Sequence, residues 1–287
     1  MMNKRNSNNS VEYCCLNGNI VPTAEAKISI TDIGILRGYA IFDSIAAMNG
    51  RIIFFDEHYE RFERSARIMH LTIPGSKRRI EAMIYKLLRK NHYDSARIKL
   101  VLTGGKLVGG LDYDVRSANL YILAQKRIVQ KEKEYLKGVK LITYEHQREI
   151  SAAKNNDYIT AVNIQPLRRR EGAAEILYTF EGNVLEATTS NFFIVKGDRL
   201  ITPKEDVLLG IVRGKVIGLA KKFMKVEERT VNVSELRTAD EAFITSTYKK
   251  VLPIIRINSL VIGSGKVGQK TKLLKEQYAG LEKKVCS

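Results

Sequence analysis

The sequence has few cysteines, and their arrangement argues against two kinds of structural crosslink. Cys14, Cys15 and Cys286 are the only three in 287 residues, an odd number without CxxC or Cys/His spacing. Neither a disulfide framework nor a zinc site is therefore indicated, and we predict no metal site. This cysteine usage is typical of a reducing compartment and favours a cytoplasmic location.

Long apolar runs are also missing. No stretch approaches the roughly 18 apolar residues that span a bilayer, so the sequence predicts no membrane helix. The first ten residues, MMNKRNSNNS, contain no apolar core of the kind that a secretory signal needs. We therefore expect a soluble protein in which residues 1–10 form a flexible polar tail.

Acidic residues are outnumbered, since 48 Lys+Arg against 31 Asp+Glu give a net charge of +17. A charge of this size raises nucleic-acid binding as an alternative function. The cations are scattered in short clusters, however, and no RNP-type aromatic motif, zinc-finger spacing or basic zipper accompanies them. A basic solvated surface is the preferred interpretation, and nucleic-acid binding is kept as the distant alternative.

Apolar periodicity predicts strands and helices in mixed order in the first half. Residues 16–22 and 38–55 are each predicted as a β-hairpin, because extended apolar runs flank an Asn-Gly turn. Asp56 is expected to cap a helix whose buried face carries Tyr59, Phe62, Ala66 and Met69. A second helix over 80–91 and strands at 97–102 and 119–124 complete the expected set.

The charged stretch at residues 125–137 is interpreted as the connection between two domains. A smaller α+β domain is predicted before it, over 11–124, and a larger domain after it, over 138–287. In the larger domain we expect strands at 139–144, 175–180, 184–187, 192–195, 241–245 and 251–257, and helices at 157–170, from Gly210, and at 270–281. Periodicity alone thus indicates a two-domain protein of mixed α/β or α+β class.

A series of short motifs takes the argument further. They are residues 17–18 with 30–32, 37–43 (RGYAIFD), 58–62 (HYERF), 154–158 (KNNDY), 181–193 (EGNVLEATTSNFF), 209–213 (LGIVR) and 243–254. In this order, over residues 15–280, they resemble the fold-type IV family of pyridoxal-phosphate enzymes. That family includes the class IV aminotransferases, such as branched-chain and D-amino-acid aminotransferases, and the 4-amino-4-deoxychorismate lyases.

The resemblance implies a two-domain fold-type IV architecture and pyridoxal 5'-phosphate as cofactor. Lys154 stands where the family has the lysine that forms a Schiff base with the cofactor and carries the substrate Cα proton. Glu186 is expected to face the pyridine nitrogen and raise its pKa, so that the ring acts as an electron sink. Tyr158, one turn beyond the lysine, is expected to meet the cofactor. Asp157, where relatives tend to have Asn, is an unexplained departure.

Three separate pieces are expected to hold the cofactor phosphate. Arg61 shares a helix face with His58, and its guanidinium can donate two bonds to an anion. Gly210, Ile211 and Val212 open a helix, where free N–H groups favour negative charge. Thr247 resembles the family's phosphate-contacting hydroxyl. Val212 departs from the family, which usually has Thr there, so a side-chain hydroxyl is missing.

Substrate recognition is predicted from five residues. Strand alternation places Arg97 and Lys99 on one face, where two cations could grip carboxylates or could simply be solvated. Backbone N–H groups of Thr247 and Tyr248 are expected to help bind a carboxylate. Arg37 lies on a loop that in this family closes over the neighbouring subunit's site, which predicts a homodimer with composite active sites.

Together these features predict an aminotransferase that moves an amino group between an amino acid and a 2-oxo acid. The amino acid is expected to be a branched-chain L- or D-amino acid or glutamate, and the sequence leaves the configuration open. Aminodeoxychorismate lyase activity on the same scaffold is the alternative.

Overall fold

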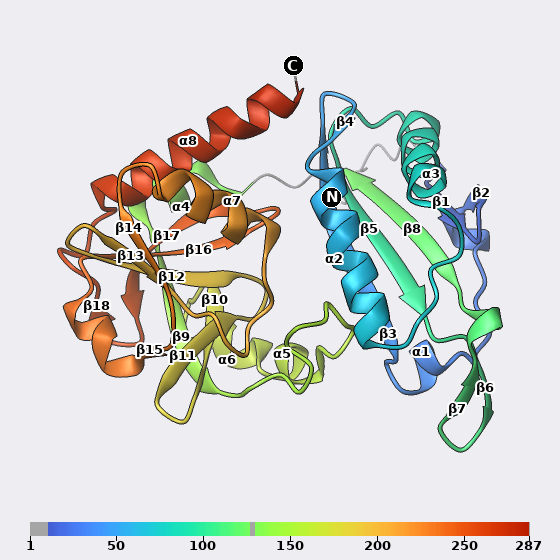
Figure 1. Cartoon of the computed structure of the whole chain (residues 1–287), viewed down its shortest axis with the longest axis horizontal. Coiled ribbons are helices and arrows are strands. Elements are labelled where there is room, and N and C mark those ends of the chain that lie inside the picture. The colour runs from blue at the N-terminus through green and yellow to red at the C-terminus, as the bar shows by residue number, and fades with distance from the viewer. Residues whose placement is uncertain (1–10, 127–129, 287) are drawn as a thin grey trace, which may run out of the picture.

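The computed structural model describes residues 11–126 and 130–286, which form two large sheets with helices packed on them (Figure 1). The tail predicted for residues 1–10 lies outside the described residues. Within the described ranges, no helix combines the length and apolar character needed to cross a membrane. The mixture of helices and sheets agrees with the predicted α+β class.

The sheet of the first half has six antiparallel strands in the order β2-β1-β8-β5-β3-β4. Their bounds are β1 Tyr13–Leu16, β2 Asn19–Pro22, β3 Ala40–Met48, β4 Arg51–Ile52, β5 Ala96–Thr103 and β8 Leu120–Lys126. The two predicted hairpins are confirmed as β1–β2 and β3–β4. Asn17, Gly18, Asn49 and Gly50 have the positive φ that such tight turns require.

Two amphipathic helices cover this sheet, α2 Phe55–Ile68 and α3 Lys77–Lys90 (Figure 1). Phe62 of α2 and Ile84 of α3 are fully buried in one core with the strands. The prediction that Asp56 caps α2 is wrong, because the helix begins at Phe55 and follows Phe54, whose φ is 52°. Phe54 and Phe55 are both buried, so their packing sets the start, and Asp56 lies in the first turn, where a carboxylate favours the helix dipole.

The sheet of the second half is mixed, with the order β14-β13-β12-β16-β17-β9-β10-β11-β15 and with β18 paired to β17. Its strands are β9 Val139–Glu145, β10 Glu175–Phe180, β11 Asn183–Ala187, β12 Asn191–Lys196, β13 Arg199–Thr202, β14 Lys225–Glu228, β15 Val231–Asn232, β16 Glu241–Ser246, β17 Lys250–Ile257 and β18 Leu260–Val261. Strands β17, β9 and β10 run parallel to one another. This arrangement includes every strand predicted for the second half.

The helices of the second half are α4 Glu132–Lys137, α5 Ile159–Asn163, α6 Gln165–Arg170, α7 Ile211–Ala220 and α8 Gln269–Cys286. The single helix predicted over 157–170 is wrong, because it divides at Ile164 into α5 and α6. Pro166 lacks an amide hydrogen and sits at the start of α6, so a new helix begins there.

Several short elements were not predicted, because their brief runs carry little periodicity. They are α1 Ile33–Leu36, the hairpin β6 Lys106–Gly109 with β7 Asp112–Asp114, the 3₁₀ turns Thr23–Glu25, Val115–Ser117 and Val233–Thr238, and, in the second half, α4, β13, β14, β15 and β18.

The two sheets meet through the segment that carries Lys154. Phe42 of β3 donates its N–H to the Lys154 carbonyl at 2.9 Å, and Asn156 donates to the Ala40 carbonyl at 2.9 Å. Phe54 also packs in a shared core with Val216 and Tyr278 of the second half. β8 extends to Lys126 and α4 occupies the end of the predicted connection, and the division into domains stays our proposal.

Candidate active site

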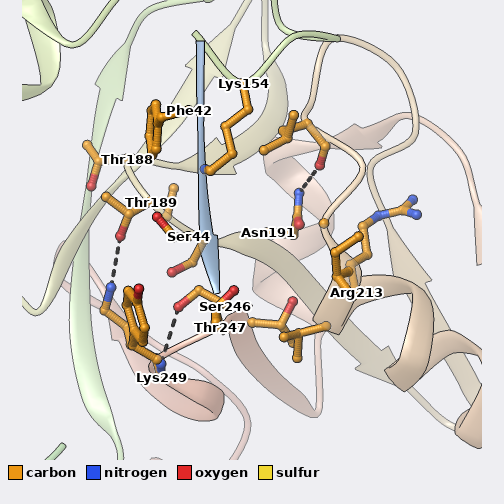
Figure 2. Close-up of a pocket in the computed structure, with 18 of the residues that line it drawn as sticks. Phe42, Ser44, Lys154, Thr188, Thr189, Asn191, Arg213, Ser246, Thr247 and Lys249 are labelled. Carbon is orange, nitrogen blue, oxygen red and sulfur yellow. Dashed lines mark hydrogen bonds between the residues drawn. The ribbon is translucent and has the colours of Figure 1, made fainter. Parts of the chain in front are cut away.

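A cavity of about 480 Å³ lies where the two sheets meet, and both halves of the chain line it (Figure 2). It brings together the predicted residues Arg61, Arg97, Lys99, Lys154, Tyr158, Glu186, Gly210, Ile211, Val212, Thr247 and Tyr248. Arg37 is not among the residues that line it. Its exposed side chain donates to the carbonyl of Leu36 at 3.0 Å.

Lys154 is fixed from both sides by backbone hydrogen bonds. Its N–H donates to Ser65 Oγ of α2 at 3.0 Å, and its carbonyl accepts from Phe42 of β3. The side chain reaches into the cavity, and its Nζ lies 4.5 Å from the centre of the Phe42 ring (Figure 2). The amine therefore has a defined position at the junction of the two halves.

The surroundings of Lys154 favour its neutral form. Burial is the main cause that lowers its pKa to about 7, and Arg61 acts in the same direction, while Asp43 and Glu186 oppose the shift. Within the described residues, no carboxylate forms an ion pair with this amine. An amine that loses its proton near neutral pH can act as a nucleophile and as a base.

A buried cluster holds Arg61 beside the cavity. Arg61 donates two hydrogen bonds to Asp43, from Nε to Oδ2 and from Nη2 to Oδ1, both at 2.8 Å. Nδ1 of His58 lies 2.7 Å from the same Oδ1. Burial alone would raise the pKa of Asp43, but Arg61 and His58 hold it well below its usual range. These bonds use Nε and Nη2, so Nη1 stays available to an anion in the cavity.

Glu186 is the carboxylate of the cavity, and three groups hold its two oxygens. Arg148 donates from Nε to Oε1 at 3.0 Å, while the N–H of Leu208 and Nδ2 of Asn191 donate to Oε2 at 3.1 and 3.3 Å. Burial raises the pKa of Glu186, and Arg148 opposes that shift. Burial also raises the pKa of Tyr158 to about 12, so its hydroxyl stays a donor at neutral pH.

Helix α7 points its N-terminal end at the cavity. Gly210 is the N-cap, and no side chain caps the first turn, so the N–H groups there are free for a ligand. A Cβ at Gly210 would lie 2.1 Å from Oδ1 of Asn191, which explains the glycine. Val212 is buried in the core and offers no hydroxyl.

Arg97 and Lys99 of β5 project into the cavity. The alternate residues of the strand, Ile98 and Leu100, are fully buried. The Arg97 guanidinium carbon lies 4.2 Å from the centre of the Tyr248 ring, and Lys99 Nζ lies 4.5 Å from that of Phe42. Burial lowers the pKa of Lys99. Neither cation forms an ion pair with a carboxylate of the described chain.

A second buried ion pair ties two turns of the cavity wall together. Glu175 lies 2.7 Å from Lys249 Nζ, and it also accepts hydrogen bonds from Thr188, Thr189 and Ser190. Lys249 donates in turn to Thr189 Oγ1 at 2.8 Å (Figure 2). The turn that carries Thr247 and Tyr248 is thereby fastened to the turn that follows Glu186.

Several of these residues were not predicted from the sequence. The missed groups are Arg148 and Glu175, together with Phe42, Asp43, Asn191 and Lys249, which were quoted within motifs but given no role. Asp43 had a usable signal, an aspartate inside the apolar strand AIFDSIAAM. Arg148 had none, because its partner is 38 residues away along the chain.

The donor set of the cavity suits a ligand that carries an anion and a basic ring nitrogen. Arg61, the start of α7 and the Thr247 turn supply anion donors, and Glu186 supplies an acceptor. Thr245 Oγ1 and Arg213 Nε are buried at residues of the wall and have no hydrogen-bond partner in the described structure. Within the described residues no group of His, Cys, Asp and Glu could hold a metal ion.

Comparison with known proteins gives a consistent result. Residues 40–257 match the model of the amino-transferase class IV family. The chain is 34% identical over 278 residues to a putative branched-chain-amino-acid aminotransferase of Methanocaldococcus jannaschii, covering 94% of this chain and 96% of the relative. It is 27% identical over 270 residues to a D-alanine aminotransferase of Listeria monocytogenes, covering 92% and 93%.

Solved structures show the same fold. The branched-chain amino acid aminotransferase of T.th., solved with pyridoxamine 5'-phosphate, matches with a TM-score of 0.84 at 27% identity over 94% of this chain and 93% of that chain. A branched-chain amino acid aminotransferase from Escherichia coli matches with a TM-score of 0.86 at 24% identity over 95% of both chains, which supports the fold.

Proposed function

Since this chain belongs to the class IV aminotransferase family, we propose that it uses pyridoxal 5'-phosphate to move an amino group between an amino acid and a 2-oxo acid, with Lys154 as catalytic residue. The observation that carries the proposal is the Lys154 amine, which projects into the cavity with its pKa lowered to about 7. Relatives named as aminotransferases and a neighbour solved with pyridoxamine 5'-phosphate support it.

The residues present can hold this cofactor. Nη1 of Arg61, the N-terminal N–H groups of α7 and Thr247 would bind its phosphate, since all three line the cavity and offer donors. Glu186 would bind its ring nitrogen, and Tyr158 would donate a hydrogen bond from its hydroxyl. Val212 has no side-chain hydroxyl, so at that position only backbone N–H groups would donate to the phosphate.

The positions of these residues indicate which role each would have in the reaction. When bound, the cofactor supplies an electron sink for the negative charge that develops at the substrate Cα. The neutral amine of Lys154 would take the proton from the substrate Cα and deliver it to the C4′ carbon of the bound cofactor, and in the reverse half-reaction it would carry the proton back to Cα. Glu186, held by Arg148, Asn191 and Leu208, keeps a carboxylate in place for the ring nitrogen.

We further propose that Arg97 and Lys99 bind the substrate carboxylates. Both cations lack a carboxylate partner in the described chain and lie over aromatic rings of the cavity. An apolar branched side chain placed against them would leave one charge unpaired, which is costly. Dicarboxylates such as glutamate and 2-oxoglutarate are therefore the expected donor and acceptor.

Half-reactions test this proposal. Loss of the cofactor absorbance band is followed with L- and D-forms of glutamate, alanine and leucine, which also decides the configuration of the substrate. Arg97→Ala and Lys99→Ala should each lower the rate constant for glutamate more than that for alanine, and Arg116→Ala, an exposed arginine outside the cavity, is the control. If both variants stay within about a factor of two of wild type for glutamate, the pair does not bind the substrate carboxylates. Release of pyruvate from aminodeoxychorismate without a second substrate would instead mark a lyase.

We also propose that the enzyme is a cytoplasmic homodimer. Several large apolar side chains are exposed in both halves, including Ile30 at 80%, Leu111 at 75% and Ile159 at 81% exposed surface. Large apolar side chains left exposed are candidates for burial in an association surface, and the exposed Arg37 follows Ile30 by seven residues, just beyond α1. By the family resemblance, the loop of Arg37 would reach the cavity of the partner in such a dimer.

A further inference from the structure

Arg148 connects two parts of the cavity that are distant in the sequence. Its Nε donates to Oε1 of Glu186 at 3.0 Å. Its Nη2 donates to the carbonyl of Ser151 at 2.7 Å, and its Nη1 donates to the carbonyl of Ala153 at 3.3 Å. Ser151 and Ala153 belong to the turn that directly precedes Lys154. One guanidinium therefore holds both the carboxylate of the cavity and the turn that carries its lysine.

The contact is shielded from solvent, with side-chain exposure of 13% for Arg148 and 10% for Glu186. Charges in such a place interact strongly, and removing one partner leaves the other uncompensated. Oε2 of Glu186 has two neutral donors, Asn191 and the N–H of Leu208, so the charged partner of this carboxylate is Arg148 on Oε1.

Arginine is suited to this double contact because its planar fork reaches several acceptors at once. A lysine at the same position would keep a positive charge near Glu186 but could not span Glu186 and both carbonyls. The charge of Arg148 and its geometry can therefore be separated by substitution.

We propose that Arg148 is a positioning residue of the transamination site, which keeps Glu186 ionised for the ring nitrogen of the cofactor and fixes the turn from which Lys154 enters the cavity. This inference rests on the proposed roles of Lys154 and Glu186. It adds a residue outside the motifs that suggested those roles.

The charges around Glu186 predict in which direction its pKa changes when Arg148 is replaced. Burial raises the pKa of Glu186, and Arg148, the N–H of Leu208 and the ammonium of Lys154 oppose it. Without Arg148, the pKa of Glu186 should rise further, so the carboxylate becomes protonated at a higher pH. A ligand that needs an ionised acceptor at its ring nitrogen should then lose affinity at that higher pH.

The test is the pH dependence of pyridoxamine 5'-phosphate binding to the full apo-protein, measured by calorimetry without turnover. We compare wild type, Arg148→Met, Arg148→Lys and the control Arg170→Met, an arginine of α6 that is 74% exposed. In Arg148→Met the loss of affinity on acidification should begin at a higher pH, and at a fixed acidic pH binding should weaken roughly tenfold for each pH unit by which this onset moves. Arg148→Lys should keep the wild-type pH dependence but bind more weakly throughout, and Arg170→Met should match wild type.

Outcomes against the proposal are distinct from failure of the proposed function. If wild type binds pyridoxamine 5'-phosphate and both Arg148 variants show its affinity and pH dependence, Arg148 has no positioning role. If wild type does not bind this ligand, the proposed function itself is wrong. Should Arg148→Met fail to fold, Arg148→Lys alone decides, because unchanged affinity in that variant would overturn the geometric part of the proposal.

Discussion

A single buried carboxylate, that of Asp43, fixes the orientation of the Arg61 side chain, which lines the cavity. Its two oxygens accept from two donors of the Arg61 fork at 2.8 Å, and its side chain is completely buried. Such an arrangement fixes the direction of Arg61 and neutralises its charge in part. At the scale of single residues, the site therefore depends on groups that never touch a ligand.

We predict that Asp43→Asn weakens binding of pyridoxamine 5'-phosphate and destabilises the fold. Breaking a buried pair leaves Arg61 uncompensated, which typically costs about 3–5 kcal/mol of unfolding free energy. Denaturant unfolding and calorimetry measure both effects. Asp56→Asn on α2 is the control, since Asp56 is 73% exposed and pairs with Lys77 at the surface. Wild-type affinity and stability in Asp43→Asn would contradict the prediction.

Lys154 should leave a signature in the pH dependence of stability. Its pKa of about 7 in the folded chain lies below the ordinary 10.5, so between these values the unfolded chain binds more protons. Stability of the apo-protein should then rise with pH across this window, by up to about 1.4 kcal/mol per pH unit. Urea unfolding at several pH values, compared with Lys154→Met, isolates this contribution. If the unfolding free energies of wild type and Lys154→Met depend on pH in the same way, the pKa of the Lys154 amine is not lowered by folding.

Sequence reasoning could place Lys154, Glu186 and Arg61 in one site only through the family motifs. The charge of Lys154 or its burial cannot be predicted from a chain with 48 Lys+Arg, because most such residues are solvated. The partners Asp43 with Arg61 and Arg148 with Glu186 are 18 and 38 residues apart. Such pairings come from the tertiary fold, and local pattern does not encode them.

At the scale of elements, the start of α7 is the best-defined ligand surface of the second half. Gly210 allows Asn191 to approach the helix end, and Asn191 in turn holds Glu186 and the carbonyl of Leu208. The sequence predicted this helix start correctly because Gly210 precedes a run in which apolar residues such as Val212 and Val216 recur at helical spacing. Its prediction of the start of α2 was wrong, because the buried Phe54 and Phe55 place that start before Asp56. Its prediction of one helix over 157–170 was also wrong, because a new helix begins near Pro166.

We predict opposite effects for two glycines of this region. Gly210→Ala should weaken pyridoxamine 5'-phosphate binding and lower stability, because its Cβ would meet Asn191 Oδ1. Gly218→Ala, at an exposed position in the last turn of α7 with no atom within 4 Å of the added Cβ, should raise stability by about 0.5–1 kcal/mol. Denaturant unfolding of both variants checks this. Equal effects of the two substitutions would refute the role given to Gly210.

At the scale of the whole molecule, the cavity is built from both sheets, so neither half holds the proposed site alone. Composition predicted a chain without a disulfide framework, and Cys14 and Cys15 lie buried in the sheet of the first half as free thiols. How a second copy associates cannot be derived from the periodicity of one chain, because exposed apolar side chains look like core positions in the sequence.

If the proposed homodimer buries Leu111, Leu111→Asp should shift it to monomer and lower activity with it, since a charge would replace an exposed apolar side chain. Light scattering at assay concentration gives the oligomeric state. Val261→Asp on β18, 43% exposed, is the matched control and should leave the dimer intact. A fully active wild-type monomer would contradict the composite site.

The identity of the cofactor-bearing lysine tests the central claim most directly. The protein loaded with pyridoxal 5'-phosphate is reduced with borohydride, digested, and mapped by mass spectrometry. We predict a pyridoxyl group on Lys154, and its loss together with transamination in Lys154→Ala. Lys99, whose amine lies over the same Phe42 ring, is the nearest competitor. A pyridoxyl group on Lys99 or on any other lysine, with Lys154 unmodified, would contradict the account.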